Sequence, residues 1–283
     1  MGSLITAVAS YCQAKINQGR WLLRIEDIDP PREVPGASED IIHTLDRLGF
    51  EWDGEIEYQS NRIEQYLQAL EKLDQSELIY ACGCSRSEIN ASATSSPYGI
   101  RYAGTCRHGL AKGKKARSLR IIVPDKTWRI TDTLQGMLEQ NLQRDIGDFV
   151  VKRADGQIAY QLAVVVDDAE QKVTEVVRGS DLLDSTVRQY YLQQCLGYTS
   201  PVYTHIPVLV NAAGEKLSKQ TGARPVDIKS AGAALVHALC YLNQQAPHSL
   251  LNAPVNEIWS WALEHWQLDH VHRQTHILED SRH

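Results

Sequence analysis

Short apolar strands alternate with amphipathic helices along this chain, and several strands run directly into charged residues. These strands are 21–25 before Glu26, 173–177 before Arg178, and 207–210 before the loop that carries Lys216. Alternating strands and helices predict an α/β fold with a largely parallel sheet. Open sheets of that kind bind ligands beyond the carboxyl ends of their strands. The charges at these ends therefore predict a pocket for a ligand that carries both an amine and carboxylates.

Composition narrows the class of protein. The chain has 283 residues, is 43% hydrophobic and carries a net charge of -6, so it has ample core and does not attract nucleic acid as a whole. No apolar run is long enough to span a bilayer, and we recognise no signal peptide. A nucleic-acid partner would need a local basic patch. The stretch 107–120, which includes Arg107, Arg120 and several lysines, is one candidate; the alternative is a solvated loop.

Apolar spacing and capping residues predict the elements. Helices are expected at 3–18, 38–48, 60–73 and 186–196, and in a tail that starts near 230. The pair Ser85 and Glu88 is a capping box, and 91–117 reads as an irregular insertion. Asp155-Gly156 predicts a hairpin between strands 149–152 and 158–166.

Three of the six cysteines lie close together along the chain. Cys82, Cys84 and Cys106 lie near the insertion, whereas the other three are isolated. This distribution does not suggest a disulfide framework; it suggests a reducing cytoplasm and one zinc site. Spacing alone makes His108 the natural fourth ligand. The alternative is that the thiols are simply reduced cysteines in a small fold.

A lysine-rich loop follows strand 207–210. In Lys216-Leu217-Ser218-Lys219-Gln220, two ammonium groups flank a serine. Mobile cations of this kind suit a substrate whose negative charge grows during reaction, such as a triphosphate losing pyrophosphate. The alternative is a solvated turn.

Four segments in order give the chain a family likeness. They read RIEDIDPPREVPG from Arg24, AVVVDD from Ala163, VVRGSDL from Val176 and KLSKQ from Lys216. In wording and register they resemble class I glutamyl-tRNA synthetases, above all the short branch, the glutamyl-Q tRNA(Asp) synthetases. The likeness covers nearly all of 2–225. It implies a Rossmann-like catalytic domain in two parts, 1–76 and 121–229, a zinc-bearing insertion at 77–120, and a short helical tail at 230–283.

The resemblance also implies roles for single residues. Glu26 would hold the substrate's α-amino group, Tyr160 would hydrogen-bond the amino acid, and Arg178 would grip the glutamate side-chain carboxylate. Arg178 could instead be a buried partner of Asp167 or Asp181. Lys219, with Lys216, would be the catalytic ATP loop. The likeness gives zinc a Cys-x-Cys…Tyr-x3-Cys ligand set, which makes Tyr102 rather than His108 the fourth ligand.

The chain starts inside the family's first signature. Short members read His-x-Gly-Ser-Leu where this chain reads Met1-Gly2-Ser3-Leu4. Gly2 and Ser3 would still offer a helix N-terminus to the phosphates of ATP. We expect the natural protein to be longer and to carry the family's first strand and its ATP-binding histidine.

The implied reaction is activation of L-glutamate by ATP with Mg²⁺, without a requirement for tRNA. Transfer to queuosine in the anticodon of tRNA(Asp) follows. The short region after the lysine loop, 221–283, favours this branch, because a full glutamyl-tRNA synthetase carries a large anticodon-binding region there. The alternatives are a shortened glutamyl-tRNA synthetase that acts on a tRNA 3′ end, and a non-catalytic, zinc-stabilised RNA-binding remnant. We expect a cytoplasmic monomer with no membrane partner.

Overall fold

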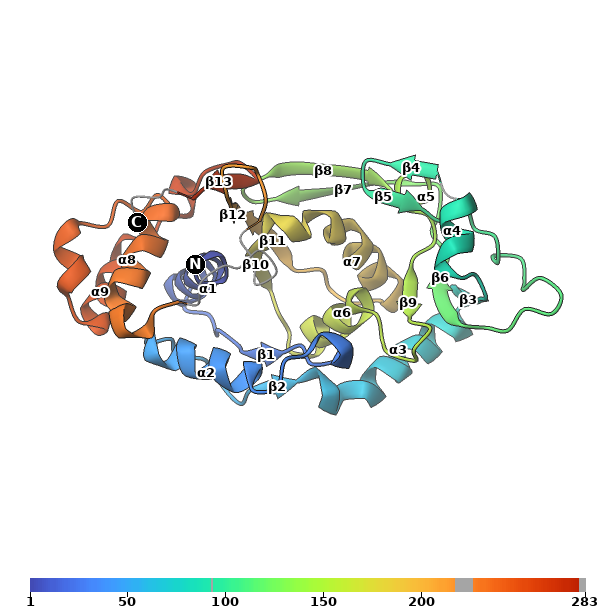
Figure 1. Cartoon of the computed structure of the whole chain (residues 1–283), viewed down its shortest axis with the longest axis horizontal. Helices are drawn as coiled ribbons and strands as arrows, with labels where there is room; N and C mark the ends of the chain where they lie inside the picture. The colour runs from blue at the N-terminus through green and yellow to red at the C-terminus, as the bar shows by residue number, and fades with distance from the viewer. Residues whose placement is uncertain (93, 217–225, 280–283) are drawn as a thin grey trace.

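The computed structural model of the chain describes residues 1–92, 94–216 and 226–279. At its centre lies a four-stranded sheet in the order β10-β11-β7-β8 (Figure 1). Strands β10 (Glu175–Gly179), β11 (Val202–Ile206) and β7 (Thr127–Asp132) are parallel, and β8 (Gly136–Asn141) returns antiparallel to β7. The carboxyl ends of three adjacent strands therefore meet at one edge.

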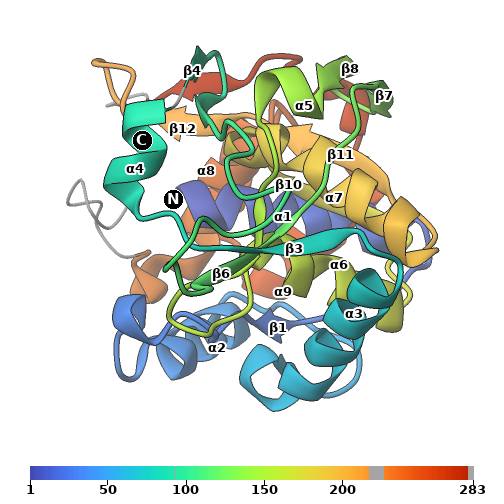
Figure 2. The same cartoon turned by 90° about the vertical axis from the view of Figure 1, so that its right-hand side faces the viewer.

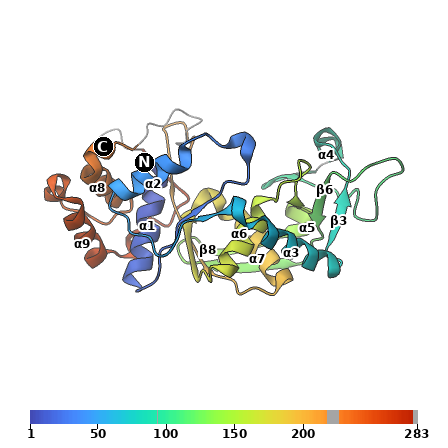
Figure 3. The same cartoon turned by 90° about the horizontal axis from the view of Figure 1, so that it is seen from below.

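Two hydrophobic cores flank this sheet. In the first, α1 (Gly2–Ile16) packs on β10 and on the tail helices α8 (Ala231–Tyr241) and α9 (Val255–His265). In the second, α3 (Ile63–Gln75), α6 (Tyr160–Glu170) and α7 (Leu183–Leu196) pack together. The tail helices lie at one end of the molecule and the insertion at the other (Figure 3). The predicted helical tail is thus part of the first core.

Two pairs of short strands lie next to predicted site residues. β1 (Arg24–Ile25) pairs in parallel with β2 (Glu57–Tyr58), next to α2 (Ala37–Arg47). β12 (Val208–Val210) pairs in parallel with β13 (His276–Leu278) from the tail. The tail strand therefore supports the segment that leads into the lysine loop.

The insertion grows from an antiparallel sheet. This sheet consists of β3 (Ile79–Cys82), β6 (Ser118–Ile121) and β9 (Val150–Lys152), in the order β3-β6-β9. Strands β3 and β6 are labelled in Figure 2. Helix α4 (Arg86–Ser92) starts with the predicted capping box: the amide of Ser85 donates to the Glu88 carboxylate at 2.8 Å, and the amide of Glu88 donates to Ser85 Oγ at 3.3 Å. The hairpin of β4 (Thr94–Ser96) and β5 (Gly99–Arg101) lies within the insertion, and the short helix α5 (Leu142–Asp145) comes later in the chain.

The structure confirms the predicted helices and corrects one strand. Residues 158–166 are not a strand, because Tyr160 begins α6 and only Ile158 bridges back to Lys152. All residues from Leu162 to Asp168 are buried, so this stretch of the helix has no solvent-exposed face. A short apolar run of this kind does not distinguish a strand from a buried helix. The β7–β8 hairpin, β11 and β13 were not predicted.

Within the described ranges, every helix is too short or too polar to cross a bilayer.

Candidate functional site

Arg178 lies at the carboxyl end of β10, directly opposite His205 on β11. Its side chain is buried, with the residue 8% exposed. Its Nε donates to His205 Nε2 at 3.0 Å, and its Nη2 donates to Thr186 Oγ1 at 3.1 Å. The guanidinium carbon lies 5.2 Å from the centre of the Tyr203 ring. No carboxylate of the described residues lies within 4.0 Å of this guanidinium.

The two acids named as alternative partners of Arg178 bind other groups. Asp167 accepts hydrogen bonds from Arg62 Nε at 2.6 Å, from Gln59 and from Tyr66. Asp181 pairs with Lys216. The pairing of Arg178 with either acid is therefore wrong for this structure.

Glu26 follows β1 and lies in a cluster of opposite charges. Its carboxylate is 3.7 Å from Arg24 Nη2, which also donates to Asp168 at 2.9 Å. Partial desolvation raises the pKa of Glu26, which Arg24 opposes, while 42% of the Glu26 side chain remains exposed. Burial likewise raises the pKa of Asp168. The cluster thus holds two carboxylates with one arginine, which leaves negative charge for a ligand ammonium.

Tyr160 occupies the first turn of α6. Burial raises the pKa of its phenol, while the charge of Arg178 lowers it and the charge of Glu26 raises it again. The charges of Arg178, on β10, and of Glu26, just after β1, both act on this phenol. That the three residues form one amino-acid site stays a prediction.

Of the residues predicted to bind ATP, the structure describes Gly2, Ser3 and Lys216. Gly2 and Ser3 form the first turn of α1, with Met1 as the N-cap. The ammonium of Lys216 forms an ion pair with the Asp181 carboxylate, just after β10. Lys219 lies outside the described residues.

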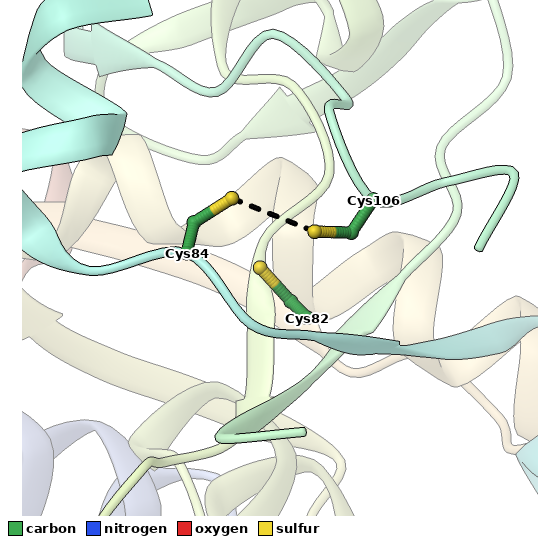
Figure 4. Close-up of side chains that lie close together, drawn as sticks. All are labelled: Cys82, Cys84 and Cys106. Atoms are coloured by element: carbon green, nitrogen blue, oxygen red, sulfur yellow. Dashed lines mark hydrogen bonds between the residues drawn. The ribbon is translucent and has the colours of Figure 1, made fainter. Parts of the chain in front are cut away.

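The three predicted thiols come together at the end of β3 (Figure 4). The sulfur atoms of Cys82, Cys84 and Cys106, here called the thiol cluster, all lie within 4.8 Å of one another. The Tyr102 hydroxyl lies 3.4 Å from the Cys82 sulfur and 3.7 Å from the Cys84 sulfur. His108 is exposed and is not part of this cluster. The Tyr102 hydroxyl thus lies beside the thiol cluster and His108 does not, while the identity of the fourth zinc ligand stays a prediction.

Two arginines of the basic stretch, Arg107 and Arg120, point inward, whereas Arg117 is exposed. The Arg120 guanidinium carbon lies 3.8 Å from the centre of the Tyr102 ring. Burial raises the pKa of Cys82, but hydrogen bonds from Tyr102, the Cys84 backbone and Arg120 lower it to about 7. Arg107 donates to both oxygens of Asp148, with Nε at 2.8 Å from Oδ2. The ends of the basic stretch thus hold the insertion together.

Several residues near Arg178 were not predicted. Asp132, Thr186 and His205 are fully or nearly fully buried polar residues on β7, α7 and β11. The available signal was a histidine inside an apolar strand, at 202–206. A lone histidine of that kind does not reveal its partners, because these come from distant parts of the chain.

The chain is similar to known tRNA synthetases. The family model for the catalytic domain of class I tRNA synthetases (E and Q) matches residues 1–241. Curated relatives named glutamyl-Q tRNA(Asp) synthetase include those of Dechloromonas aromatica, 53% identical over 98% of this chain and 93% of the relative, and Pseudomonas aeruginosa, 46% identical over 99% and 93%. That of Neisseria meningitidis serogroup C is 50% identical over 96% and 92%.

A solved structure supports the fold. The glutamate tRNA ligase of Elizabethkingia meningosepticum, solved in complex with its amino acid, superposes with a TM-score of 0.81 at 22% sequence identity. The match covers 99% of this chain and 64% of the solved chain. The predicted class I synthetase fold is confirmed, and the chain belongs to the glutamyl-Q tRNA(Asp) synthetase family of class I tRNA synthetases.

Proposed function

We propose that this protein is a ligase that activates glutamate with ATP and transfers it to queuosine in the anticodon of tRNA(Asp). The observation that carries the proposal is the burial of the Arg178 guanidinium. A buried guanidinium without a carboxylate among the described residues is costly unless a ligand supplies the anion. The side-chain carboxylate of glutamate is a planar acceptor that matches the guanidinium fork.

The remaining amino-acid contacts follow from charge. Glu26 would hold the α-ammonium of glutamate, because the cluster of Glu26, Asp168 and Arg24 has an excess of negative charge. Tyr160 would donate its phenolic hydrogen to the bound amino acid. Three contacts of different type would thereby select a substrate with an ammonium and a second carboxylate.

Activation would take place toward the lysine loop. The α-carboxylate oxygen of glutamate attacks the α-phosphorus of Mg-ATP, the bond to pyrophosphate breaks, and glutamyl-adenylate forms. Lys216 and Lys219 would balance the charge that develops on pyrophosphate, and the amides of Gly2 and Ser3 would bind phosphate oxygens. A hydroxyl of the queuosine cyclopentene ring then attacks the acyl carbon, and AMP leaves.

The thiol cluster would hold one structural zinc ion. Three sulfurs and the Tyr102 oxygen form a compact four-donor set, and thiolates are preferred zinc ligands. The local core consists only of the three buried residues Cys82, Tyr102 and Cys106 with a few partly buried neighbours. Since so small a core orders a loop poorly, the ion would supply folding energy there.

A curated relative supports the proposed substrate. The match to the Dechloromonas aromatica relative, which is named for tRNA(Asp), is 53% identical and covers 93% of that relative. The protein would act as a monomer in the cytoplasm, where ATP and tRNA are available.

Two assays test the proposal. First, the protein should catalyse glutamate- and ATP-dependent pyrophosphate exchange without tRNA; its absence would favour the non-catalytic alternative. Second, labelled glutamate should attach to tRNA(Asp) whose 3′-terminal adenosine has been removed enzymatically, and should do so only when that tRNA carries queuosine. Label that is lost with the terminal adenosine would contradict transfer to queuosine and identify the 3′ end as the acceptor.

A further inference from the structure

We propose that His205 and Asp132 are a positioning pair that fixes the Arg178 guanidinium and thereby sets the preference for glutamate. The inference rests on the proposed role of Arg178 in binding the side-chain carboxylate of glutamate. Neither His205 nor Asp132 would touch the substrate; both would act through Arg178.

The pair is built into the sheet. Arg178 on β10 is opposite His205 on β11, and Tyr203, two residues before His205, is opposite Asp132 on β7. Residues two apart on a strand share a face. The three side chains therefore form a row across three parallel strands. The side chains of His205 and Asp132 have no solvent exposure.

The direction of every hydrogen bond in this row is fixed. The Nε of an arginine always carries a hydrogen, so His205 Nε2, at 3.0 Å, accepts. The hydrogen of a neutral imidazole must then be on Nδ1, which donates to Asp132 Oδ2 at 2.6 Å. The other oxygen of Asp132 accepts from the backbone amides of His205, Leu134 and Gln135 at 3.2, 3.1 and 2.8 Å. Asp132 is thus held as a carboxylate with a defined orientation.

Charge supports the same assignment. Burial lowers the pKa of His205, and the charge of Arg178 lowers it further against the opposing effect of Asp132. Hydrogen bonds from His205 and the backbone outweigh burial and lower the pKa of Asp132. The neutral imidazole gives Arg178 an acceptor without neutralising its charge.

One edge of the Arg178 guanidinium makes no hydrogen bond to the described residues. His205 takes the Nε hydrogen and Thr186 takes one from Nη2, whereas Nη1 has no hydrogen bond to a described residue. A guanidinium held at one edge presents its other edge at a fixed angle, so less entropy is lost when a carboxylate binds. The pair therefore leaves Arg178 charged, oriented and incompletely bonded.

Asp132→Asn is the most direct test, because it changes hydrogen-bond direction with almost no change in shape. The amide oxygen can keep the backbone contacts, while the amide nitrogen can only donate to His205 Nδ1. The histidine hydrogen then moves to Nε2 and opposes the Nε hydrogen of Arg178. In pyrophosphate exchange we expect the KM for glutamate to rise roughly tenfold to a hundredfold, with the KM for ATP unchanged.

Matched variants separate this inference from the proposed function. Tyr191→Phe removes a hydrogen bond of 2.6 Å to the Ile122 carbonyl elsewhere in the same core, and should leave the KM for glutamate unchanged. If Arg178→Lys raises the KM for glutamate but a folded Asp132→Asn protein does not, the positioning pair is refuted and the proposed function stands. If Arg178→Lys has no effect either, the proposed role of Arg178 is refuted.

Two further measurements keep the inference testable if Asp132→Asn fails to fold. The imidazole ¹⁵N spectrum of the wild-type protein should show His205 protonated on Nδ1 only; a hydrogen on Nε2 would overturn the proposal. In addition, His205→Gln, whose side-chain oxygen can accept from Arg178, should retain a lower KM for glutamate than His205→Phe. Equal KM values in the two folded variants would also overturn it.

Discussion

Two arginines in this protein, Arg120 and Arg178, share unusual surroundings. They are 7% and 8% exposed, and the nearest tyrosine rings lie 3.8 and 5.2 Å from their guanidinium carbons. Within the described residues, neither has a carboxylate inside 4.0 Å. Arg120, however, lies near the Cys82 thiol, which can ionise and whose pKa it lowers, and it donates to the Asp148 carbonyl, whereas Arg178 donates only to the uncharged His205 and Thr186.

The difference shows that the partners available to a buried cation determine its role. The charge of Arg120 can be balanced inside the protein by a thiolate of the cluster, so Arg120 belongs to the structure of the insertion. The charge of Arg178 has no such internal partner among the residues described, so it favours an anion from outside. Variants near Arg120 should therefore change stability, and variants at Arg178 should change glutamate binding.

Removal of zinc should have the largest effect on stability. It should act on the insertion around Arg120 and not on the surroundings of Arg178. If free zinc exceeds its dissociation constant a thousandfold, the bound ion stabilises the folded state by about 4 kcal/mol. We expect a chelator, or Cys106→Ser, to lower Tm correspondingly and to release about one zinc per chain, as determined by metal analysis.

Cys240→Ser is the matched control, because Cys240 is a free cysteine on α8, far along the chain from the thiol cluster. It should retain zinc and respond to the chelator as the wild-type protein does. A purified protein that holds no zinc and keeps its Tm in chelator would refute the metal site.

Asp148→Asn should have the next largest effect, again on stability. Asp148 accepts hydrogen bonds from Arg107, Tyr80 and the Val123 amide, and its backbone carbonyl accepts from Arg120. Loss of the charged acceptor should lower the free energy of unfolding by about 1.5–3 kcal/mol. Urea unfolding at neutral pH measures this; Asp125→Asn, an exposed aspartate that also pairs with an arginine, should have much less effect.

The same variant predicts a dependence on pH. Burial would raise the pKa of Asp148, but Arg107, Val123 and Tyr80 bring it below the ordinary value. A depressed pKa in the folded state stabilises the protein above the unfolded-state pKa of about 3.9, and this contribution is lost as pH falls through the folded-state pKa. Wild-type and Asp148→Asn stabilities should therefore converge in acid. A constant difference down to strongly acidic pH would contradict the assignment.

These two regions also show how far the sequence leads. The thiol spacing and the motif around Arg178 predict which residues gather, because each motif is local and has a strong chemical signal. The partners Asp148 and His205 were not predicted, since the contacts Arg107–Asp148 and Arg178–His205 join residues 41 and 27 positions apart. The strand predicted at 158–166 was wrong for the same reason: burial on all sides of α6 is a tertiary property.

Arg178→Lys should change function and not stability. An ammonium cannot reproduce a bidentate contact, so the KM for glutamate should rise at least roughly tenfold, or about 1.4 kcal/mol, while the KM for ATP stays constant. Arg129→Lys, an exposed arginine on β7, is the control. A loss of stability as large as that of Asp148→Asn, with unchanged KM for glutamate, would place Arg178 in the same structural class as Arg120.

Lys216→Met should have the smallest effect and tests whether the ion pair beside Arg178 is structural or catalytic. The Lys216–Asp181 pair is half-exposed, so its loss should lower the free energy of unfolding by less than about 1 kcal/mol. Asp181→Asn breaks the same pair but keeps the ammonium. If Lys216 assists pyrophosphate departure, Lys216→Met should slow adenylate formation severalfold while Asp181→Asn does not, with glutamate affinity unchanged in both. Equal rates in the two variants would make the pair a surface contact, and would leave the charge on pyrophosphate to Lys219.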